Sequence, residues 1–451
     1  MSELRFSLQW LAAASGAAEL RHTSAQLGLF VGETSLTRNE DIWSQTVRDS
    51  VLVSAYPLAM WLASSWWRLS YEPLPLAGWL PTHDWRMAHE LGAANHGFVW
   101  PRVLFASDGE AVNVWAAPTA AQGQSVQYLQ GLDQPRAIAL GDFQHSLQTF
   151  IHTVLSRLDA KALPDTDLAS LWALVQEDMA DAEAARCRRL EAELGFDPEE
   201  CPPAMLEQAR AYQQRIGEAA LSELAPILRG HNNNGPDLSV IARLDGTTGL
   251  LGVPTVGAGD VDHLAQGLPW QRAVHAARSL RQRLGNANGP MDDQNLYDLL
   301  GLTTSQVSAW HTEGRPRAAV AIPEPENRFR FVPRKRHNGR HNEAQRFEFA
   351  RFLGDIVRPA AGAAGGWLAC TDLATSRQKY QRAFAAEFLC PIEALMDFLS
   401  GDFDQAAIEE ASARFDVSEQ TIRSLLANNG HPTRTGWTQD LPYAMAPAKG
   451  L

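Results

Sequence analysis

The sequence is poor in features that mark several protein classes. Its 451 residues include four cysteines, at positions 187, 201, 370 and 390, and none has the Cys-x-x-Cys spacing of a metal or redox motif. Scattered cysteines of this kind favour reduced thiols in a cytoplasmic protein. No run of about 18 apolar residues is present, and the first residues lack the charged-then-apolar pattern of a signal peptide. We therefore expect neither a membrane partner nor secretion.

Positive charge is in deficit, since the formal net charge is −13 at pH 7. This balance excludes an indiscriminate nucleic-acid binder. One stretch departs from it, because between residues 328 and 351 eight basic residues stand against two acidic ones. Such a stretch suits phosphate backbones or an acidic partner surface. A solvated loop that leads into a helix is the alternative.

The first 160 residues have the patterns of a mixed α+β unit. Apolar residues alternate at positions 4, 6, 8 and 10, as in a strand with one buried face. Residues 102–115 predict a hairpin with its turn at Asp108-Gly109, and residues 143–158 predict an amphipathic helix. The apolar stretch 51–67 indicates a buried helix. We expect core positions, rather than a base-stacking platform, for the tryptophans of this unit, which are Trp43, Trp61, Trp66, Trp67, Trp79, Trp85, Trp100 and Trp115.

A chain of this length is expected to form roughly two to four domains. Beyond the first unit, one helix is predicted from a cap at Asp165 or Thr166 to Gly195, and a further helical stretch reaches Leu228. Strands are predicted at 318–322 and 329–332. The segments after residue 160 are a helical region, a Gly- and Asn-rich linker or exposed loop, a second helical region, a C-terminal domain and a tail, at 161–229, 230–267, 268–314, 315–435 and 436–451.

Residues 406–430 have the pattern of a helix-turn-helix element. Ser418 is placed to cap the second helix, and Asn429-Gly430 is placed to end it. As a DNA-reading helix it would present Gln420 and Arg423 to base edges and phosphates. Use of the same element as part of the fold is the alternative.

Two histidine clusters are weaker candidates for metal binding. His89 and His96 are seven residues apart, so on one helix they would lie about 10 Å apart, too far to share one tetrahedral ion. His337 and His341 are four apart, but their Asn-Gly and Arg-rich surroundings indicate a loop. Ordinary surface or helix-end histidines are the alternative in both places.

Two further blocks carry a family resemblance. Residues 346–355 read Arg-Phe-Glu-Phe-Ala-Arg-Phe-Leu-Gly-Asp, and residues 384–391 read Phe-Ala-Ala-Glu-Phe-Leu-Cys-Pro. They resemble the two blocks of the ImmA/IrrE family of zinc metallopeptidases, which read roughly Arg-Phe-x-x-Ala-His-Glu-x-Gly-His and Phe-Ala-Ala-Glu-Leu-Leu-x-Pro. The resemblance covers about residues 315–430. It implies a mostly helical, metallopeptidase-like C-terminal domain with a small sheet, within a multidomain α+β protein.

The residues that would perform the family's chemistry are replaced. Arg351 occupies the position of the family's first zinc histidine, Phe352 that of its general base and Asp355 that of its second histidine. The family's third ligand is an acid shortly before the Phe-Ala motif, and residues 376–383 contain none. A catalytic zinc needs three N, S or O ligands, whereas an arginine stays protonated and repels a dication. We therefore expect no zinc, no other cofactor and no peptidase activity.

The two predicted helices that carry these blocks are instead rich in cations. One interpretation is a pocket that binds an anion or a partner through guanidinium groups. The alternative is structural, with Arg351 and Asp355 paired along one helix at i and i+4. The candidate residues for the pocket are Arg346, Arg351, Asp355, Arg377, Lys379 and Arg382.

These observations favour a non-catalytic sensor or interaction protein with a protein partner. Members of the family often act beside helix-turn-helix repressors in phage immunity, mobile elements and stress responses, so the resemblance implies a similar setting. Three alternatives stay open: a zinc peptidase with rearranged ligands, an enzyme with its site in the N-terminal unit, and a DNA-binding regulator. The regulator would use Arg334, Lys335, Arg336, Arg340, Gln420 and Arg423.

Overall fold

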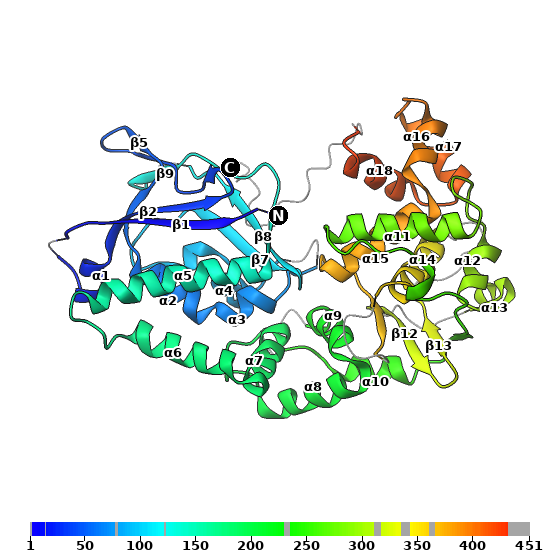
Figure 1. Cartoon of the computed structure of the whole chain (residues 1–451), viewed down its shortest axis with the longest axis horizontal. Helices are drawn as coiled ribbons and strands as arrows, with labels where there is room; N and C mark the ends of the chain where they lie inside the picture. The colour runs from blue at the N-terminus through cyan, green and yellow to red at the C-terminus, as the bar shows by residue number, and fades with distance from the viewer. Residues whose placement is uncertain are drawn as a thin grey trace. The chain divides into compact units, whose positions relative to one another are not determined.

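A computed structural model describes residues 2–13, 15–76, 80–120, 123–229, 235–310, 317–334, 343–359 and 366–431. These residues form two compact units, the first made mainly of residues up to 206 and the second mainly of the later residues (Figure 1). Helices and several small antiparallel sheets make up both, which confirms the mixed α+β class. Within the described residues, no helix is both long and apolar enough to cross a membrane.

The first sheet of the N-terminal unit is built around β2 (Ser24–Val31). This strand pairs antiparallel with β1 (Leu4–Trp10), β3 (Thr34–Ser35) and β6 (Val51–Ser54). The predicted strand at residues 4–10 is therefore confirmed. Its inward face meets the core, where Phe6 stacks on a phenylalanine of the longest helix of the unit with ring centroids 4.4 Å apart.

The predicted hairpin is also confirmed. β7 (Arg102–Ser107) and β8 (Ala111–Ala117) pair antiparallel, and β10 (Arg136–Ala139) extends the sheet from β8. Asp108 fixes the turn, because its Oδ1 accepts a hydrogen bond from the backbone N–H of Ala111 at 2.9 Å. A third small sheet has the order β5-β4-β9, with bounds Thr46–Arg48, Asn39–Asp41 and Val126–Tyr128.

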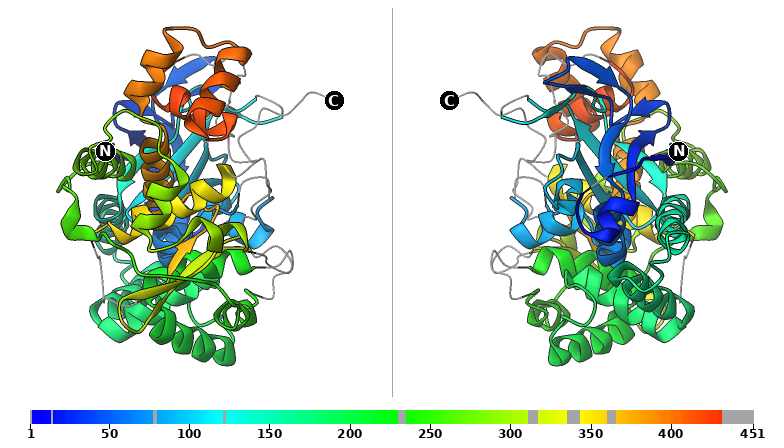
Figure 2. Two further views of the ribbon diagram at one scale, coloured as in Figure 1. Left: turned by 90° about the vertical axis from the view of Figure 1, so that its right-hand side faces the viewer. Right: turned by 90° about the vertical axis from the view of Figure 1, so that its left-hand side faces the viewer.

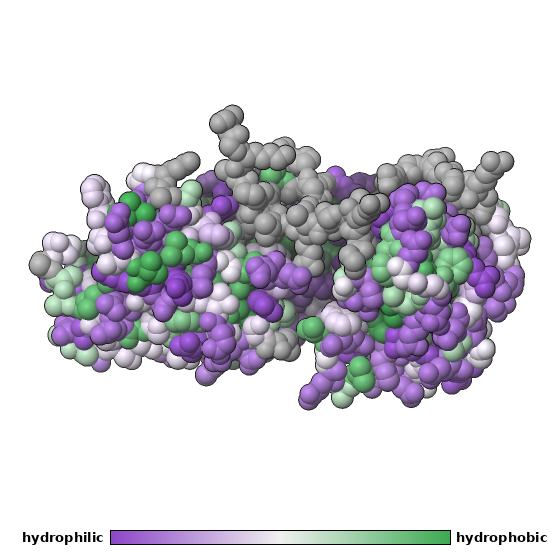
Figure 3. All heavy atoms as spheres, turned by 90° about the horizontal axis from the view of Figure 1, so that it is seen from above, coloured by the Kyte–Doolittle hydropathy of each residue, from purple (hydrophilic) through white to green (hydrophobic). Residues whose placement is uncertain are grey.

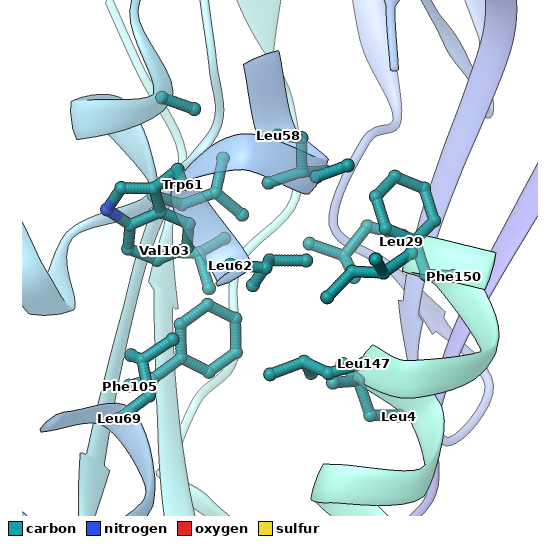
Figure 4. Packing of buried hydrophobic residues seen from close by; sticks show 14 of the residues in the cluster. Leu4, Leu29, Leu58, Trp61, Leu62, Leu69, Val103, Phe105, Leu147 and Phe150 are labelled. Atoms are coloured by element: carbon teal, nitrogen blue, oxygen red, sulfur yellow. The ribbon is translucent and has the colours of Figure 1, made fainter. Parts of the chain in front are cut away.

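Helices bury one face of these sheets. α5 (Leu140–Asp159) is the predicted amphipathic helix, and its buried stripe includes Leu147 and Phe150. Figure 4 shows these side chains opposite Leu4 and Leu29 of the sheet, with Leu62 beside them. The remaining helices of the unit before residue 100 are α1 (Ala18–His22), α2 (Tyr56–Ser64), α3 (Trp66–Tyr71), α4 (His83–His89) and η1 (Leu91–Ala94).

Two helix predictions in this unit need correction. Residues 51–67 begin as β6 and not as a helix, because two β-branched valines favour a strand and Pro57 starts α2. The single helix expected up to Gly195 is two helices, α6 (Asp167–Ala180) and α7 (Ala182–Leu194). Asp181 has extended backbone between them and caps α7 through its carboxylate. Thr166 and Gly195 cap the outer ends as predicted.

Most of the tryptophans in this unit belong to the core as predicted. Those at 61, 66, 67, 85 and 100 are buried, and Trp115 is partly buried. Trp43 is the exception, since it is 88% exposed on the loop between β4 and β5. Trp79 lies outside the described residues. On the face shown in Figure 3, hydrophobic side chains form smaller groups among mostly hydrophilic ones.

The C-terminal unit contains a sheet of order β11-β13-β12-β14. The predicted strands are confirmed as β12 (Ala319–Glu324) and β13 (Arg328–Val332), and β14 (Leu368–Cys370) lies at one edge. β11 (Leu250–Gly252) comes from the segment expected to be a linker or loop. Gly252 allows this strand to lie close to the neighbouring backbone, because a Cβ at this position would lie 2.3 Å from the carbonyl oxygen of Leu300.

The helices between residues 203 and 308 lie in the predicted helical regions except for two, α10 (Ser239–Asp245) and η2 (Ala258–Asp260), which lie in the segment expected to be a linker or loop. Arg281 is buried and donates to the carbonyl oxygens of Phe388 and Gly289, so it ties the end of a later helix to this region. The other elements are α8 (Pro203–Ile216), α9 (Glu218–Leu228), α11 (Pro269–Arg283), α12 (Asp293–Leu299) and α13 (Thr304–Ser308).

The last part of the unit begins with α14 (Glu343–Ile356) and α15 (Ser376–Leu389), and α15 packs against both α11 and α14. It ends with α16 (Ile392–Leu399), α17 (Gln405–Phe415) and α18 (Glu419–Asn428). These three helices lie together, coloured orange to red in Figures 1 and 2.

The ring of Phe105 joins strand and helix layers in the N-terminal core, with ring centroids 6.3 Å from Trp61 and 5.6 Å from Phe143. We expect Phe105→Ala to lower the free energy of unfolding of this unit by about 3–5 kcal/mol, because it leaves a cavity that rigid neighbours cannot fill. Urea denaturation followed by tryptophan fluorescence measures the change. Leu80→Ala is the control, since Leu80 is 78% exposed. An equal loss in both variants would contradict the assignment.

Candidate functional site

The two sequence blocks of the family resemblance lie on neighbouring helices, α14 and α15. Gly354 sets their separation, because a Cβ at this position would lie 2.7 Å from the ring of Phe384. The glycine of the first block and the phenylalanine of the second therefore meet at one contact. Phe352 points into an aromatic cluster, with its ring centroid 5.5 Å from that of Phe331 and 6.4 Å from that of Phe349. Phe352 is thus part of the apolar core.

Arg351 is buried, and its guanidinium reaches only uncharged oxygens. Its Nη2 donates to the carbonyl oxygen of Thr371 at 2.6 Å, to Oε1 of Gln378, and to Oε1 of Gln381 at 3.3 Å. Its Nε has no hydrogen-bond partner among the described residues. Arg351 is therefore held inside the unit by hydrogen bonds to one backbone carbonyl and two glutamine side chains.

Asp355 is the anion of the site. Its carboxylate accepts from Arg377 Nε at 2.9 Å and from Gln381 Nε2 at 3.1 Å, and Arg358 Nε lies 3.2 Å away. Burial alone would raise the pKa of Asp355, but Arg377 and Arg358 outweigh it and hold the pKa below its ordinary value. The expected pairing with Arg351 along one helix is therefore corrected. The ion pair runs from α14 to α15.

A second buried acid, Glu223 of α9, reaches the same region. Its Oε1 accepts from Thr375 Oγ1 at 2.6 Å, and Thr371 Oγ1 lies 3.4 Å from Oε2. Burial raises the pKa of Glu223, although Thr375 and Arg377 oppose the rise. Sequence reasoning missed this residue because it lies far upstream, in a helical stretch with no motif.

The other candidate cations make separate contacts. Arg346 pairs with Asp416 at 2.8 Å and donates to the carbonyl oxygen of Met291 and to Asp293. Arg382 donates to the carbonyl oxygen of Leu373 at 2.9 Å. Burial, with Arg351 nearby, lowers the pKa of Arg382 to about 10. Lys379 is half-buried on α15. The structure thus gathers Arg351, Asp355 and Arg377, while Arg346 joins α14 to α12 and to the turn before α18.

The basic stretch is only partly described. Arg334 binds Asp372 through both Nη atoms, at 2.6 and 3.0 Å, and its backbone N–H donates to Glu348 at 2.7 Å. This bidentate pair engages the guanidinium inside the unit. Lys335, Arg336 and Arg340 lie outside the described residues, as does the cluster of His337 and His341.

The helix-turn-helix layout is confirmed as α17 and α18, and Ser418 caps α18 by accepting from Thr421 N at 3.2 Å. Gln420 is exposed. Arg423 donates to Gln405 and lies 3.7 Å from Glu419, so it is held against its own element. The exposed acids of α17, Glu409 and Glu410, oppose close approach of a phosphate backbone.

The N-terminal histidines do not share a helix face, because α4 ends at His89. His89 is buried, with Nδ1 2.9 Å from the carbonyl oxygen of Phe105 and Nε2 3.0 Å from a carboxylate oxygen of Glu72. It stacks on Trp85 with ring centroids 4.0 Å apart. His96 lies beyond the helix, near the carbonyl oxygen of Ala94. His89 is therefore a hydrogen-bonded core histidine.

Comparisons with known proteins add no family to this geometry. A scan against protein-family models, a search of curated proteins and a search of solved structures each return no match. The resemblance to ImmA/IrrE peptidases stays a prediction that rests on the two blocks. Within the described part of the chain, no group of three or more His, Cys, Asp and Glu side chains is placed to hold a metal ion.

We expect Arg377→Met to lower the free energy of unfolding by about 3–5 kcal/mol, because it leaves a buried carboxylate without its main partner. The double variant Arg377→Met with Asp355→Leu should lose less than the sum of the single losses, since neither charge is then stranded. Chemical denaturation of the four proteins in this cycle measures the coupling. Arg328→Met, in an exposed ion pair with 3.5 Å between charges, is the control and should cost less than about 1 kcal/mol. Additive losses would contradict a coupled pair.

Glu223→Gln should stabilise the chain increasingly as pH rises. The folded-state pKa of Glu223 is raised, so its contribution is fully present below the unfolded pKa and is lost as pH rises through the folded pKa. Glutamine keeps an acceptor for Thr375 and has no proton to lose in this range. Unfolding free energies of both proteins across neutral pH measure the effect, which we expect to reach about 1–2 kcal/mol. A benefit that shrinks with rising pH would refute the assigned shift.

Proposed function

We propose that this chain is a non-catalytic regulatory or interaction protein that acts through a protein partner. In this proposal the region 315–435 keeps a metallopeptidase-like scaffold whose metal position has been replaced by an internal ion pair. The observation that carries it is the contact of Asp355 with Arg377 and Arg358, beside the buried guanidinium of Arg351. The resemblance suggests phage defence, mobile-element control or a stress response as the setting.

The electrostatics of the site support the loss of peptidase chemistry. A zinc ion at Asp355 would lie among the guanidinium groups of Arg351 and Arg377, which repel it in a region shielded from water. Drawing Asp355 toward the ion would also strand Arg377, whose main buried counter-ion it is. No proton acceptor replaces the family's general base at Phe352.

A zinc site with rearranged ligands finds little support nearby. Among the described residues near Asp355, Glu223 and Cys370 are two groups that could bind a metal, and metal ligands must be deprotonated. Burial raises the pKa of the Cys370 thiol to about 12, and it also raises the pKa of Glu223. The Cys370 thiol therefore favours its protonated form, which does not bind a metal, and the raised pKa of Glu223 makes its carboxylate a weaker competitor for a cation.

The purified full chain should contain well under one zinc per molecule, measured by elemental analysis after exchange into zinc-containing buffer and dialysis. It should also hydrolyse a denatured protein substrate no faster after zinc loading than after chelator treatment. Asp355→Asn is the matched control, because it would abolish any zinc bound at this position. One zinc per chain that disappears in this variant, together with chelator-sensitive hydrolysis, would replace the proposal with a zinc peptidase. Duplex DNA binding that falls steeply with added salt would favour a DNA-binding regulator instead.

A further inference from the structure

The N-terminal unit contains a cavity of about 730 Å³, and His96 of the first histidine cluster is among its lining residues. Its walls come from α2, α3, α4, η1, α6, α7 and the loop after α7. This volume falls in the usual range for small-molecule sites. All its lining residues belong to one compact unit, so the cavity is a property of that unit.

The apolar part of the wall combines buried aromatic rings with exposed aliphatic side chains. Trp61 and Trp67 are buried, at 6% and 3% exposure, and line the cavity. Met87 and Leu174 also line it but are 46% and 62% exposed. Figure 4 shows the Trp61 side chain against the core residues of the same unit, which fix its ring. A ligand with an apolar body would cover Met87 and Leu174 while resting on rigid walls.

The polar part of the wall has more carboxylates than cations. Arg68 is buried, and its guanidinium binds three acids, namely Glu72 at 2.6 Å, Asp84 at 2.8 Å and Asp197 at 3.5 Å. Glu72 also meets His89. Of these acids, Asp84 and Asp197 line the cavity, and a single guanidinium cannot neutralise both, so negative charge remains on this side of the cavity.

The same arrangement occurs around the second arginine of the wall. Arg188 lies 2.8 Å from Asp178, 2.8 Å from Glu191 and 2.8 Å from Glu199. Glu177 also lines the cavity and has no ion-pair partner among the described residues. Two arginines, each shared by three acids, therefore leave the cavity negative at both places.

The titration of Asp197 agrees with this charge imbalance. Burial raises the pKa of Asp197, Arg68 lowers it, and the neighbouring Asp84 raises it again, so that the net shift is upward. A carboxylate that stays partly uncompensated beside its own arginine is stabilised by a further cation.

We propose that this cavity binds a small organic cation, a primary ammonium group carried on an apolar body. The carboxylates around Arg68 and Arg188 receive the ammonium, and the apolar body covers Trp61, Met87 and Leu174. An anionic ligand would be repelled by the net negative charge of the cavity. A neutral apolar ligand would leave that charge uncompensated and would therefore bind less tightly than a cation. The assignment concerns the N-terminal unit alone and does not depend on the loss of peptidase chemistry in the C-terminal unit.

Three probes with one alkyl chain and different head groups test the charge preference. Octylamine, octanol and octanoate are titrated into the full chain by calorimetry at low ionic strength. Octylamine should bind at least about tenfold more tightly than octanol, since a charge-assisted contact in a partly dry site is worth that factor. Octanoate should bind most weakly. No binding of octylamine, or equal binding of octanol, would overturn the proposal, and so would tighter binding of octanoate.

Variants locate the binding in the cavity. Asp197→Asn should weaken octylamine binding about tenfold and Glu177→Gln about threefold, with little effect on octanol. Leu174→Gln should weaken both ligands. Glu183→Gln is the matched control, because Glu183 is an exposed acid of α7 that does not line the cavity. Thermal unfolding verifies that each variant is folded. If Asp197→Asn does not fold, Glu177→Gln still tests the site.

The outcomes of the variant series are distinct. Weaker octylamine binding in Glu177→Gln but not in Glu183→Gln supports the site. Equal effects of these two variants would place the ligand elsewhere and overturn the assignment. Displacement of octylamine by magnesium ion at comparable concentration would assign the carboxylates to a metal instead. Zinc content and peptidase activity are not readouts here, so either proposal can fail while the other stands.

Discussion

The buried contact between Asp355 and Arg377 is the constraint on which the C-terminal unit depends. It joins α14 to α15, and these helices carry both blocks that resemble the peptidase family. Removing charges from water is costly, and such a pair is tolerated only when each partner is matched and further hydrogen bonds complete the shell. Gln381 supplies one of these bonds to Asp355, and a second one to Arg351. Charge compensation inside the protein thus holds these two helices together.

Much of the fold followed from local patterns in the sequence. The strand at 4–10, the hairpin at Asp108-Gly109 and the helix at 143–158 were predictable because period and turn chemistry agree there. Predictions failed where tertiary contacts decide the outcome. The Gly- and Asn-rich composition of residues 230–267 predicts a linker or loop, yet Gly252 allows β11 to approach the backbone of Leu300. The sequence also does not predict that the helix is interrupted at Asp181, because an aspartate within an apolar-periodic stretch can lie inside a helix as well as cap a new one.

The sequence predicted the residues of the candidate site better than the contacts between them. The spacing of Arg351 and Asp355 suggested a pair along one helix, but partners from another helix offered better geometry. Glu223 could not be assigned, because no local pattern distinguishes a buried acid from an exposed one on a helix. The same applies to Arg68 and Arg188, whose carboxylates come from separate helices and loops. Residue type and spacing identify charges, whereas only the folded chain determines which of them share a partner.

The glycine at 354 has a consequence for how this unit can move. With no side chain there, the ring of Phe384 rests directly on the α14 backbone, so rotation of one helix about the other meets immediate steric resistance. The two helices must travel together as one rigid body. Any rearrangement of this unit would then have to bend the chain at the connections that flank this pair.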